Sequence, residues 1–460
     1  MQSKEEVNPF RDPPQRKRWI LTRRGLTIAG LIVVLVAVVL FLVCVVTRTF
    51  WSNGLIDPAT PKGAYTRASV TNPSQTLQLV WSDEFNVDGR SFYPGDDPFW
   101  EAVDLHYWQT GDLEWYNQDA VTTRNGSLEI TLEMKQNHNL QYSSGMVSTW
   151  NNFCFTGGLI ETSVSLPGAN NIVGLWPAVW TMGNLGRAGY GASLEGMWPY
   201  TYDACDVGTM PNQTLNGQPA AALSNGDPTQ GGVLSFLPGQ KLSRCTCNGE
   251  SHPGPKHSDG TFVGRSAPEI DIFEATIGGN PIQGRVSQSL QAAYKGGVFQ
   301  QAMSALTITD QSAYELEGKT FSTYGFEYKP GFNNAFITWI SSGVEAWTLI
   351  QSGALAADPQ VQISSRPVPQ EPLYIIANLG ISPNFGTPDL QHLTFPTTMR
   401  VDWVRVYQPS DALNVGCDPA DFPTQSYINQ YIEAYTNPNL TTWRNDFGQP
   451  FPKNSLAGQC

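Results

Sequence analysis

Two stretches of the sequence indicate the fold: residues 127–134 read SLEITLEM, and residues 159–166 read LIETSVSL. In both, every second side chain lies on the same face of an extended strand, and one face is mainly apolar. Similar short runs, separated by Gly, Pro and Asn turns, continue from Leu77 to about Gln408. This rhythm predicts an all-β domain over residues 77–410, built as an antiparallel β-sandwich.

A helical pattern occurs after the predicted sandwich, in an extension that spans residues 411–460. Apolar residues recur there at the spacing of a helix face, between Pro423 and Pro438. The residues that carry this pattern are Tyr427, Ile428, Tyr431, Ile432 and Tyr435. We therefore expect one amphipathic helix near the end of the chain.

Charge is divided unevenly between the start of the chain and the rest. Residues 1–25 carry a net charge of +4, whereas residues 26–460 carry −17. Because nucleic-acid binding needs clustered Lys and Arg side chains, this acidic body excludes DNA and RNA as partners.

Residues 26–46 form an apolar segment of 21 residues without a charge. As a helix it would be roughly 31 Å long, enough to cross the hydrocarbon core of a bilayer. A cleaved signal peptide is the alternative, but its apolar core is normally shorter and ends at small residues. Basic residues precede the segment, so the pattern predicts a cytosolic tail over residues 1–25 and a transmembrane signal anchor over 26–46. Residues 47–76, rich in Pro, Asn, Thr and Ser, are predicted to be a stem.

This topology makes the protein a single-pass type II membrane protein of the ER and Golgi or of the plasma membrane. Its main domain would be lumenal or extracellular, and its contact with the lipid bilayer would be made by residues 26–46. Three sequons follow the anchor and are predicted glycosylation sites: Asn125, Asn212 and Asn439.

The cysteines agree with an oxidising compartment. Cys44 lies in the apolar segment, and six cysteines follow it, an even number that predicts three disulfides. Their pairing has 15 solutions, among which we expect Cys417 to pair with Cys460, because these two bracket the predicted helix. Zinc binding by Cys245 and Cys247 is the alternative, but C-x-C without a second pair is a poor zinc site, so we expect neither metal nor cofactor.

One region breaks the strand rhythm. Residues 183–267 are dense in Gly, Pro, Asn and Cys, and loops of this length within a compact domain are usually functional or disordered. The cysteines and aromatic residues of this region indicate an ordered insertion.

Residues 269–274 read EIDIFE, so that three acids occur within one apolar strand. One β-bulge between Asp271 and Glu274 would bring all three carboxyl groups to the same face. The carboxyls of Glu269 and Glu274 would then lie roughly 5 Å apart, the separation found in retaining glycosidases. In such enzymes one carboxylate attacks the anomeric carbon, and the other protonates the leaving oxygen. The charges of Glu269 and Asp271 should raise the pKa of Glu274, which suits the acid.

This hexapeptide resembles the ExDxxE catalytic strand of glycoside hydrolase family 16, in the bulged form of its laminarinase-like members. Further motifs of that family lie at residues 79–86, 142–149, 174–180, 335–339 and 401–407. The resemblance implies a concanavalin A-like jelly roll with Glu269 as nucleophile, Glu274 as acid/base and Asp271 orienting the nucleophile. It also implies that aromatic side chains bind sugar, for which we expect Trp176, Trp180 and, more weakly supported, Trp115.

Residues 105–108, 112–116, 183–187 and 198–208 are similar to fungal membrane proteins required for β-1,6-glucan synthesis, a signal-anchored branch of the same superfamily. Two features depart from these patterns. Met146 stands where laminarinase-like members often carry an Arg that contacts glucan, and the tail before the anchor is about 25 residues long, shorter than is usual in the fungal relatives.

Together, these features predict a retaining β-glucan-active glycosidase or transglycosidase that acts in fungal cell-wall β-1,6-glucan assembly. A non-catalytic, membrane-anchored glucan-binding scaffold is the alternative. We expect a β-glucan polysaccharide or oligosaccharide as ligand, whereas protein partners stay open. The insertion joins the strand near Trp176 to the catalytic strand, so we expect it to wall one end of the cleft and to favour transfer over hydrolysis.

Overall fold

The computed structural model describes residues 54–224, 226, 228–291 and 303–460. The predicted cytosolic tail and the apolar segment 26–46 lie outside the described residues, so the membrane anchor stays a prediction. In the described part of the chain, every helix is too short or too polar to cross a bilayer. The chain divides into two units, residues 1–58 and 59–460, and the second unit holds all the elements below.

Two antiparallel sheets form the body of this unit. Within the described residues, nine strands form the larger sheet in the order β1-β2-β18-β9-β14-β15-β16, with β6 attached to β18 and β5 to β6. Seven strands form the smaller sheet in the order β13-β12-β11-β10-β17-β8-β3, and β4 pairs in parallel with β7. The strand bounds are β1 Thr66–Ala68, β2 Thr76–Asp83, β3 Glu101–Ala102, β4 Glu114–Tyr116, β5 Val121–Arg124, β6 Ser127–Leu132, β7 Tyr142–Ser144, β8 Met146–Ser148, β9 Gly158–Ser165, β10 Leu175–Gly183, β11 Glu269–Gly278, β12 Gln283–Gln291, β13 Met303–Ile308, β14 Ser322–Lys329, β15 Phe336–Ser341, β16 Val344–Ile350, β17 Leu373–Ile381 and β18 Thr397–Pro409.

The helices of the described residues are all short. The α-helices are α2 Gly191–Leu194, α3 Gln351–Ala354, α4 Gln425–Gln430 and α5 Ile432–Thr436. The 3₁₀ turns are η2 Lys62–Ala64, η3 Trp108–Thr110, η4 Gln118–Ala120, η5 Val207–Thr209, η6 Pro211–Gln213, η7 Ala220–Leu223, η8 Pro228–Gln230 and η9 Pro383–Phe385.

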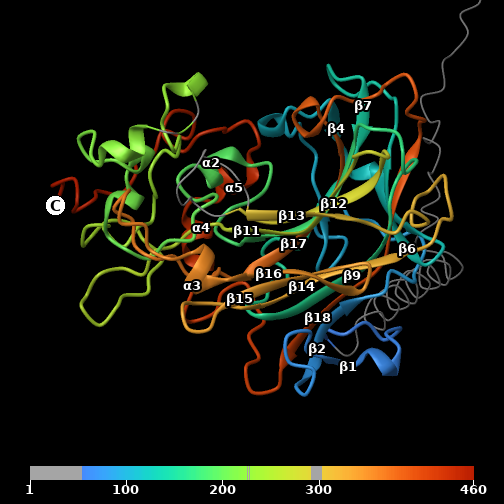
Figure 1. The fold of residues 1–460 in the computed structure, drawn as a ribbon, viewed down its shortest axis with the longest axis horizontal. Helices are drawn as coiled ribbons and strands as arrows, with labels where there is room; N and C mark the ends of the chain where they lie inside the picture. Colours follow the sequence, from blue (N-terminus) through green and yellow to red (C-terminus); the bar gives the residue numbers. More distant parts are fainter. Residues whose placement is uncertain (1–53, 225, 227, 292–302) are drawn as a thin grey trace, which may run out of the picture. The chain divides into compact units, whose positions relative to one another are not determined.

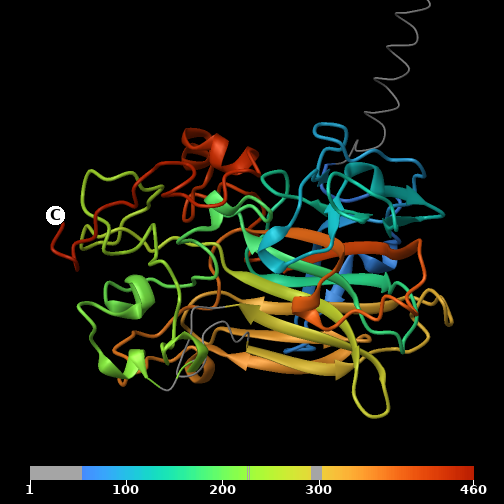
Figure 2. The ribbon, with the colours of Figure 1, turned by 90° about the horizontal axis from the view of Figure 1, so that it is seen from above.

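The two sheets stack face to face, as Figures 1 and 2 show. The alternating stretches that predicted strands are confirmed as β6 and β9, whose apolar side chains Ile130 and Ile160 are buried. Buried Gln288 on β12 links the layers, because its side-chain amide donates a hydrogen bond of 2.9 Å to the carbonyl of Ile340 on β15. The predicted all-β sandwich is therefore confirmed, with a jelly-roll-like arrangement.

The sandwich begins before the predicted boundary at residue 77. Strand β1, which falls within the predicted stem 47–76, pairs with β2 at the edge of the larger sheet. Arg67 on this strand donates two hydrogen bonds of 3.0 Å to Glu161 on β9. This three-residue strand carries no apolar alternation that would mark it in the sequence, and the ion pair adds a long-range contact to its backbone pairing with β2.

Residues 183–267 and 411–460 together form what we call the outer lobe. In Figures 1 and 2 these green and red segments lie side by side beyond one end of the sandwich. The two segments bind each other through long-range contacts: Arg187 donates to the carbonyl of Tyr435 at 2.8 Å, and the hydroxyl of Tyr435 donates to the carbonyl of Leu185 at 3.0 Å. The predicted insertion is thus an ordered region that packs against the C-terminal extension.

The disulfides are Cys154–Cys417, Cys205–Cys245 and Cys247–Cys460. The number predicted is confirmed, but the predicted Cys417–Cys460 pair is wrong. Residues 414–416 run beside residues 154–156, which places Cys417 next to Cys154. Residues 453–455 instead run beside residues 245–247, which brings the end of the chain to Cys247.

The predicted C-terminal helix is confirmed in position but is divided into α4 and α5. Tyr431 separates the two, with a backbone conformation (φ −119°, ψ 31°) outside the helical region. Tyr427, Ile428 and Tyr435 are buried, as the spacing predicted, whereas Ile432 is exposed because it follows the break.

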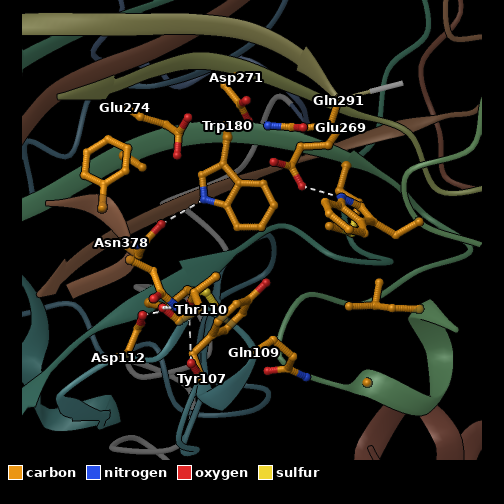
Figure 3. A pocket seen from close by; sticks show the side chains of 18 of the residues that line it. Tyr107, Gln109, Thr110, Asp112, Trp180, Glu269, Asp271, Glu274, Gln291 and Asn378 are labelled. Atoms are coloured by element: carbon orange, nitrogen blue, oxygen red, sulfur yellow. Dashed lines mark hydrogen bonds between the residues drawn. The ribbon is translucent and has the colours of Figure 1, made fainter. Parts of the chain in front are cut away.

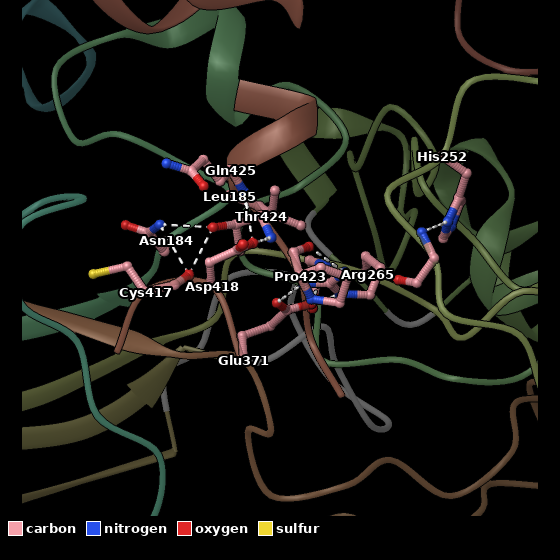
Figure 4. Close-up of polar contacts among 12 residues, drawn as sticks. Asn184, Leu185, His252, Arg265, Glu371, Cys417, Asp418, Pro423, Thr424 and Gln425 are labelled. Carbon is pink, nitrogen blue, oxygen red and sulfur yellow. Dashed lines mark hydrogen bonds and ion pairs between the residues drawn. The ribbon is translucent and has the colours of Figure 1, made fainter. Parts of the chain in front are cut away.

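Buried polar contacts hold the outer lobe to the sandwich (Figure 4). Arg265 at the end of the insertion forms a two-pronged ion pair with Glu371, which lies just before β17, with both distances 2.8 Å. Arg265 also donates to the carbonyl of Pro423 in the extension at 2.8 Å. A single buried guanidinium thus joins the insertion, the extension and the sandwich.

Candidate active site

Strand β11 carries the three predicted catalytic carboxyl groups and contains the predicted bulge. Its pairing with β12 places Asp271 opposite Ser289 and Glu274 opposite Ser287, so three steps along β11 match two along β12. This extra residue returns Glu274 to the face that Glu269 and Asp271 share. The bulge prediction is therefore confirmed.

The bulge leaves backbone carbonyls without regular strand partners, and buried side chains compensate for this. The amide of Gln288 donates to the carbonyl of Ile272 at 2.8 Å. The indole of Trp339, from the opposite sheet, donates to the carbonyl of Asp271 at 2.8 Å. Because an unpaired buried carbonyl is costly, these two side chains stabilise the bulged conformation.

The carboxyl groups of β11 face a cavity of about 820 Å³ (Figure 3). Glu269, Asp271 and Glu274 all line it, as do the predicted sugar-binding residues Trp176 and Trp180 of β10. The outer lobe also lines this cavity, through Leu194, Trp198, Phe236, Leu237 and Pro238. The expectation that the insertion walls the cleft is confirmed in this respect.

Burial dominates the electrostatics of the three carboxyl groups. It raises the pKa of Glu269 to about 8, with a further contribution from the charge of Glu274. It also raises the pKa of Glu274 to about 8, with a further contribution from the charge of Asp271. The pKa of Asp271 lies well above its usual range because of burial and the charge of Glu269. The predicted rise for Glu274 is present, but its main cause is burial and not neighbouring charge.

Asp271 is held between two partners on the same face. The hydroxyl of Ser289 on β12 donates a short hydrogen bond to one carboxyl oxygen of Asp271. Asp271 and Glu269 are also hydrogen-bonded to each other, which lowers the pKa of Glu269 and raises that of Asp271. This contact therefore favours the ionised form of Glu269 and the protonated form of Asp271.

Each of the two glutamates also accepts a hydrogen bond from an indole N–H. Trp198 of the insertion donates to Glu269 at 2.7 Å, and Trp176 of β10 donates to Glu274 at 3.0 Å. Because an indole only donates, it fixes one carboxyl oxygen as an acceptor and orients the group. Sequence reasoning had placed Trp198 in a motif but had given it no role.

The three tryptophans predicted to bind sugar have different surroundings. Trp176 stacks on Phe385 with ring centroids 4.2 Å apart, so one of its faces is covered. Trp180 donates its N–H to Asn378 at 2.8 Å, and both side chains line the cavity. Trp115 is not among the described residues that line the cavity: it stacks on His138 at 3.6 Å. The structure thus brings Trp176 and Trp180 to the carboxyl groups but leaves Trp115 apart.

A second polar wall lies opposite the carboxyl groups and was not predicted. It includes Tyr107, Gln109, Asp112 and Asn378, which Figure 3 shows across the cavity from β11. Asn378 donates to the hydroxyl of Tyr116 at 3.1 Å, which donates to Asp112 at 3.1 Å. Asp112 and Tyr116 are close together in the sequence, but Asn378 of β17 is 262 residues from Tyr116, so local sequence offers no signal for the complete set of hydrogen bonds.

The chemical character of the cavity favours a neutral, hydroxyl-rich ligand. Among the described residues that line it, there are acids, amides and aromatic side chains but no Lys, Arg or His. Such a surface offers nothing to pair with a phosphate or carboxylate. In the described part of the chain, no group of three or more His, Cys, Asp or Glu side chains is arranged to hold a metal ion.

Met146 and the three sequons also have defined positions. Met146 on β8 is buried and lines the cavity. Asn125 and Asn439 are exposed, and Asn212 is partly buried within η6. Glycosylation at these positions stays a prediction.

Comparison with known proteins places this chain among glucan-related proteins. It is 46% identical over 433 residues to the beta-glucan synthesis-associated protein SKN1 of Candida albicans, a match covering 88% of this chain and 55% of the relative. It is 44% identical over 435 residues to the beta-glucan synthesis-associated protein KRE6 of Saccharomyces cerevisiae, covering 89% of this chain and 57% of the relative. The chain thus spans about half the length of the curated relatives that it matches.

Among solved structures, the chain is similar to an endo-beta-1,3-glucanase from Pyrococcus furiosus. The two share 19% sequence identity with a TM-score of 0.45, over 76% of this chain and 98% of the other.

A family defined by sequence matches nearly the whole of the body described above, over residues 40–294 and 292–460. The chain belongs to this family, the beta-glucan synthesis-associated proteins SKN1/KRE6/Sbg1.

Proposed function

We propose that this domain is a retaining β-glucan-active glycosidase or transglycosidase that acts in the assembly of cell-wall β-1,6-glucan. The observation that carries the proposal is the bulged strand β11, which presents Glu269 and Glu274 to one cavity. The acidic and aromatic lining suits a neutral sugar. The names of the relatives, beta-glucan synthesis-associated proteins, support glucan as the ligand.

In the first step, the carboxylate of Glu269 attacks the anomeric carbon and forms a covalent glycosyl ester. The bond to the leaving glycosidic oxygen breaks, and that oxygen takes the proton of Glu274. The raised pKa of Glu274, about 8, keeps this proton in place at neutral pH. The hydrogen bonds that Glu269 makes with Trp198 and Asp271 lower its pKa and so oppose the effect of burial on its ionised form.

In the second step, a hydroxyl group attacks the anomeric carbon and releases Glu269. Glu274, now ionised, takes the proton of that hydroxyl group and returns to its starting state. A sugar hydroxyl gives transfer, and water gives hydrolysis. The apolar side chains of the outer lobe, Leu194, Phe236 and Leu237, line the cavity near Glu269 and favour a sugar acceptor by limiting water.

The test is Glu269→Gln in the full chain, assayed with labelled β-1,3- and β-1,6-gluco-oligosaccharides. The amide is nearly isosteric but a poor nucleophile, so turnover should fall by about a thousandfold or more while glucan binding persists. Glu433→Gln, on the exposed surface of α5, is the matched control and should leave turnover unchanged. Normal glucan content in cells that depend on the Glu269→Gln variant would contradict the catalytic proposal.

A non-catalytic glucan-binding scaffold is the second candidate. It is favoured by the raised pKa of Glu269, because a protonated carboxyl group at neutral pH binds sugar hydroxyls but does not attack carbon. For this candidate we expect no turnover by the unmodified protein and full wall assembly with any variant that still binds glucan. The oligosaccharide assay separates the two functions directly.

For cellular location, we propose a single-pass type II membrane protein with this domain in the lumen of the secretory pathway or outside the cell. The basic residues before the apolar segment 26–46 and the exposed sequons Asn125 and Asn439 support this orientation. Endoglycosidase treatment should increase the electrophoretic mobility of the expressed protein. Unchanged mobility, with all three sequons unmodified by mass spectrometry, would contradict the orientation.

A further inference from the structure

We infer that a series of hydrogen bonds, running from Trp180 through Asn378 and Tyr116 to Asp112, positions the indole against which the reacting glucose lies. The inference rests on the proposed function, because it takes a β-glucan as the ligand. It adds three positioning residues that take no part in the two chemical steps, and it gives the second polar wall of the cavity a role.

Trp180 lies at the centre of the sheet face that carries the carboxyl groups. The pairing of β10 with β11 places it directly opposite Asp271. The residues two positions before and after Trp180 are opposite Glu274 and Glu269, respectively. Because opposed residues of neighbouring strands point to the same face, the indole lies between the two glutamates and lines the cavity with them (Figure 3). A glucose that reacts with both glutamates therefore lies against this indole.

The first hydrogen bonds of the series have only one possible direction. The indole N–H of Trp180 donates to the side-chain oxygen of Asn378 on β17 at 2.8 Å, and an indole can only donate. Asn378 must therefore turn its amide nitrogen away from Trp180, and this nitrogen donates to the hydroxyl of Tyr116 on β4 at 3.1 Å. Tyr116 in turn donates its own proton to Asp112 at 3.1 Å.

A glycine allows β4 to approach β17 closely enough for these contacts. A Cβ on Gly380, two residues beyond Asn378, would lie 3.1 Å from a carboxyl oxygen of Glu114 and 3.2 Å from the hydroxyl of Tyr116. The approach is fixed by the backbone of Ile381, whose N–H donates to Glu114 at 3.1 Å. The series is thus built into the junction of two strands.

Asp112 is the acceptor at the end of the series. Its carboxyl group is buried and also accepts a hydrogen bond of 2.6 Å from the hydroxyl of Thr110. Burial raises the pKa of Asp112, although its hydrogen bonds with Thr110, Glu114 and Tyr116 oppose this rise. Each of these bonds favours the carboxylate, the form that accepts from Tyr116. Rotation of the indole of Trp180 would leave buried polar groups without partners, so the series restrains its orientation.

The experiment is a double-mutant cycle in the full polypeptide with Tyr116→Phe and Asn378→Leu, which remove the hydroxyl and the amide with little change of shape. For each variant, kcat/KM is measured with labelled β-1,3- and β-1,6-gluco-oligosaccharides. We expect each single variant to lower kcat/KM by about five- to tenfold. The double variant should match Asn378→Leu within about twofold, because the series is already broken. Effects that multiply, or an unchanged kcat/KM for Tyr116→Phe, would overturn the inference.

A second readout follows the indole itself. Labelling with fluorotryptophan gives each indole a fluorine NMR signal, and the signal of Trp180 is identified by its loss in Trp180→Phe. We expect this signal to shift in Tyr116→Phe, since Tyr116 acts on the indole through Asn378. Tyr65→Phe, at a 43% exposed position, is the matched control and should change neither the signal nor kcat/KM.

The NMR measurement needs no turnover and so separates the inference from the proposed function. An unmoved Trp180 signal in Tyr116→Phe would overturn the inference, whatever the activity of the protein. Absence of both turnover and binding of gluco-oligosaccharides by the unmodified protein would instead contradict the proposed function.

Discussion

The sandwich and the outer lobe are stabilised in different ways, although both line the same cavity. In the sandwich, long strands pair in regular registers, and β9 is buried along all eight of its residues. In the outer lobe, the described residues of the insertion contain one four-residue α-helix and short 3₁₀ turns. Instead, the outer lobe is held together by two disulfides, Cys205–Cys245 and Cys247–Cys460, and by side-chain-to-backbone hydrogen bonds.

The candidate site lies where these two differently stabilised regions meet. Glu269 belongs to the sandwich, but its indole donor, Trp198, belongs to the outer lobe. The first two predictions below test whether the outer lobe is an integral part of the site, the third tests the sandwich side of it, and all three are ordered by the size of the expected effect.

The first prediction concerns the ion pair that joins the two regions. Glu371→Gln leaves the fully buried Arg265 without a counter-charge, so we expect the free energy of unfolding to fall by about 3–5 kcal/mol. Chemical denaturation followed by tryptophan fluorescence measures this loss. Asp259→Asn, which removes the exposed partner of Arg244, is the control and should leave the midpoint unchanged. If the denaturation midpoint of Glu371→Gln equals that of the unmodified protein, the outer lobe is attached to the sandwich mainly by other contacts.

The second prediction concerns the contribution of the outer lobe to chemistry. Trp198→Phe keeps an aromatic ring but removes the donor to Glu269, so kcat should fall by about 10- to 100-fold, the value of a hydrogen bond to a charged group. The pKa of Glu269 should also rise, since the indole lowers it, and the pH dependence of kcat should shift upward. A purely structural role would lower stability without this shift. Trp403→Phe on β18, in the larger sheet, is the control.

The third prediction concerns the cost of the buried carboxyl groups to the sandwich. The pKa of Glu274 is about 8 in the folded protein, above its value of about 4.5 in an unfolded chain. The folded state therefore retains a proton that the unfolded state loses, and stability falls as pH rises from about 4.5 to about 8.

Glu274→Gln removes this titration while its side-chain oxygen can still accept from Trp176. We expect its melting temperature to exceed that of the unmodified protein by about 2–4 °C at pH 8, and to match it at pH 4.5. Calorimetry at the two pH values measures the difference. An equal shift at both values would show that the effect has nothing to do with proton binding.

The contrast between the sandwich and the outer lobe also explains which residues of the site could be predicted from the sequence. The bulge of β11 and its three carboxyl groups were predicted because acids and apolar residues alternate within six consecutive positions. Trp198 and Gln109 were not, because nothing in their neighbours along the chain indicates that they face β11. For the same reason, local sequence did not indicate that Trp115 stacks on His138, outside the described residues that line the cavity, and its role in sugar binding stays a prediction.

By itself, the sequence determined the all-β class, the approximate positions of the strands, the strand of three carboxyl groups with its bulge, and the place of the insertion. These features follow from local periodicity, since the spacing of apolar side chains decides which face each strand buries. Tertiary structure alone decided that Cys417 pairs with Cys154, that β1 joins the sandwich and that segment 105–113 lines the cavity. Each of these depends on which distant segments become neighbours, and that choice is made by the packing of the whole domain and not by any one stretch of the chain.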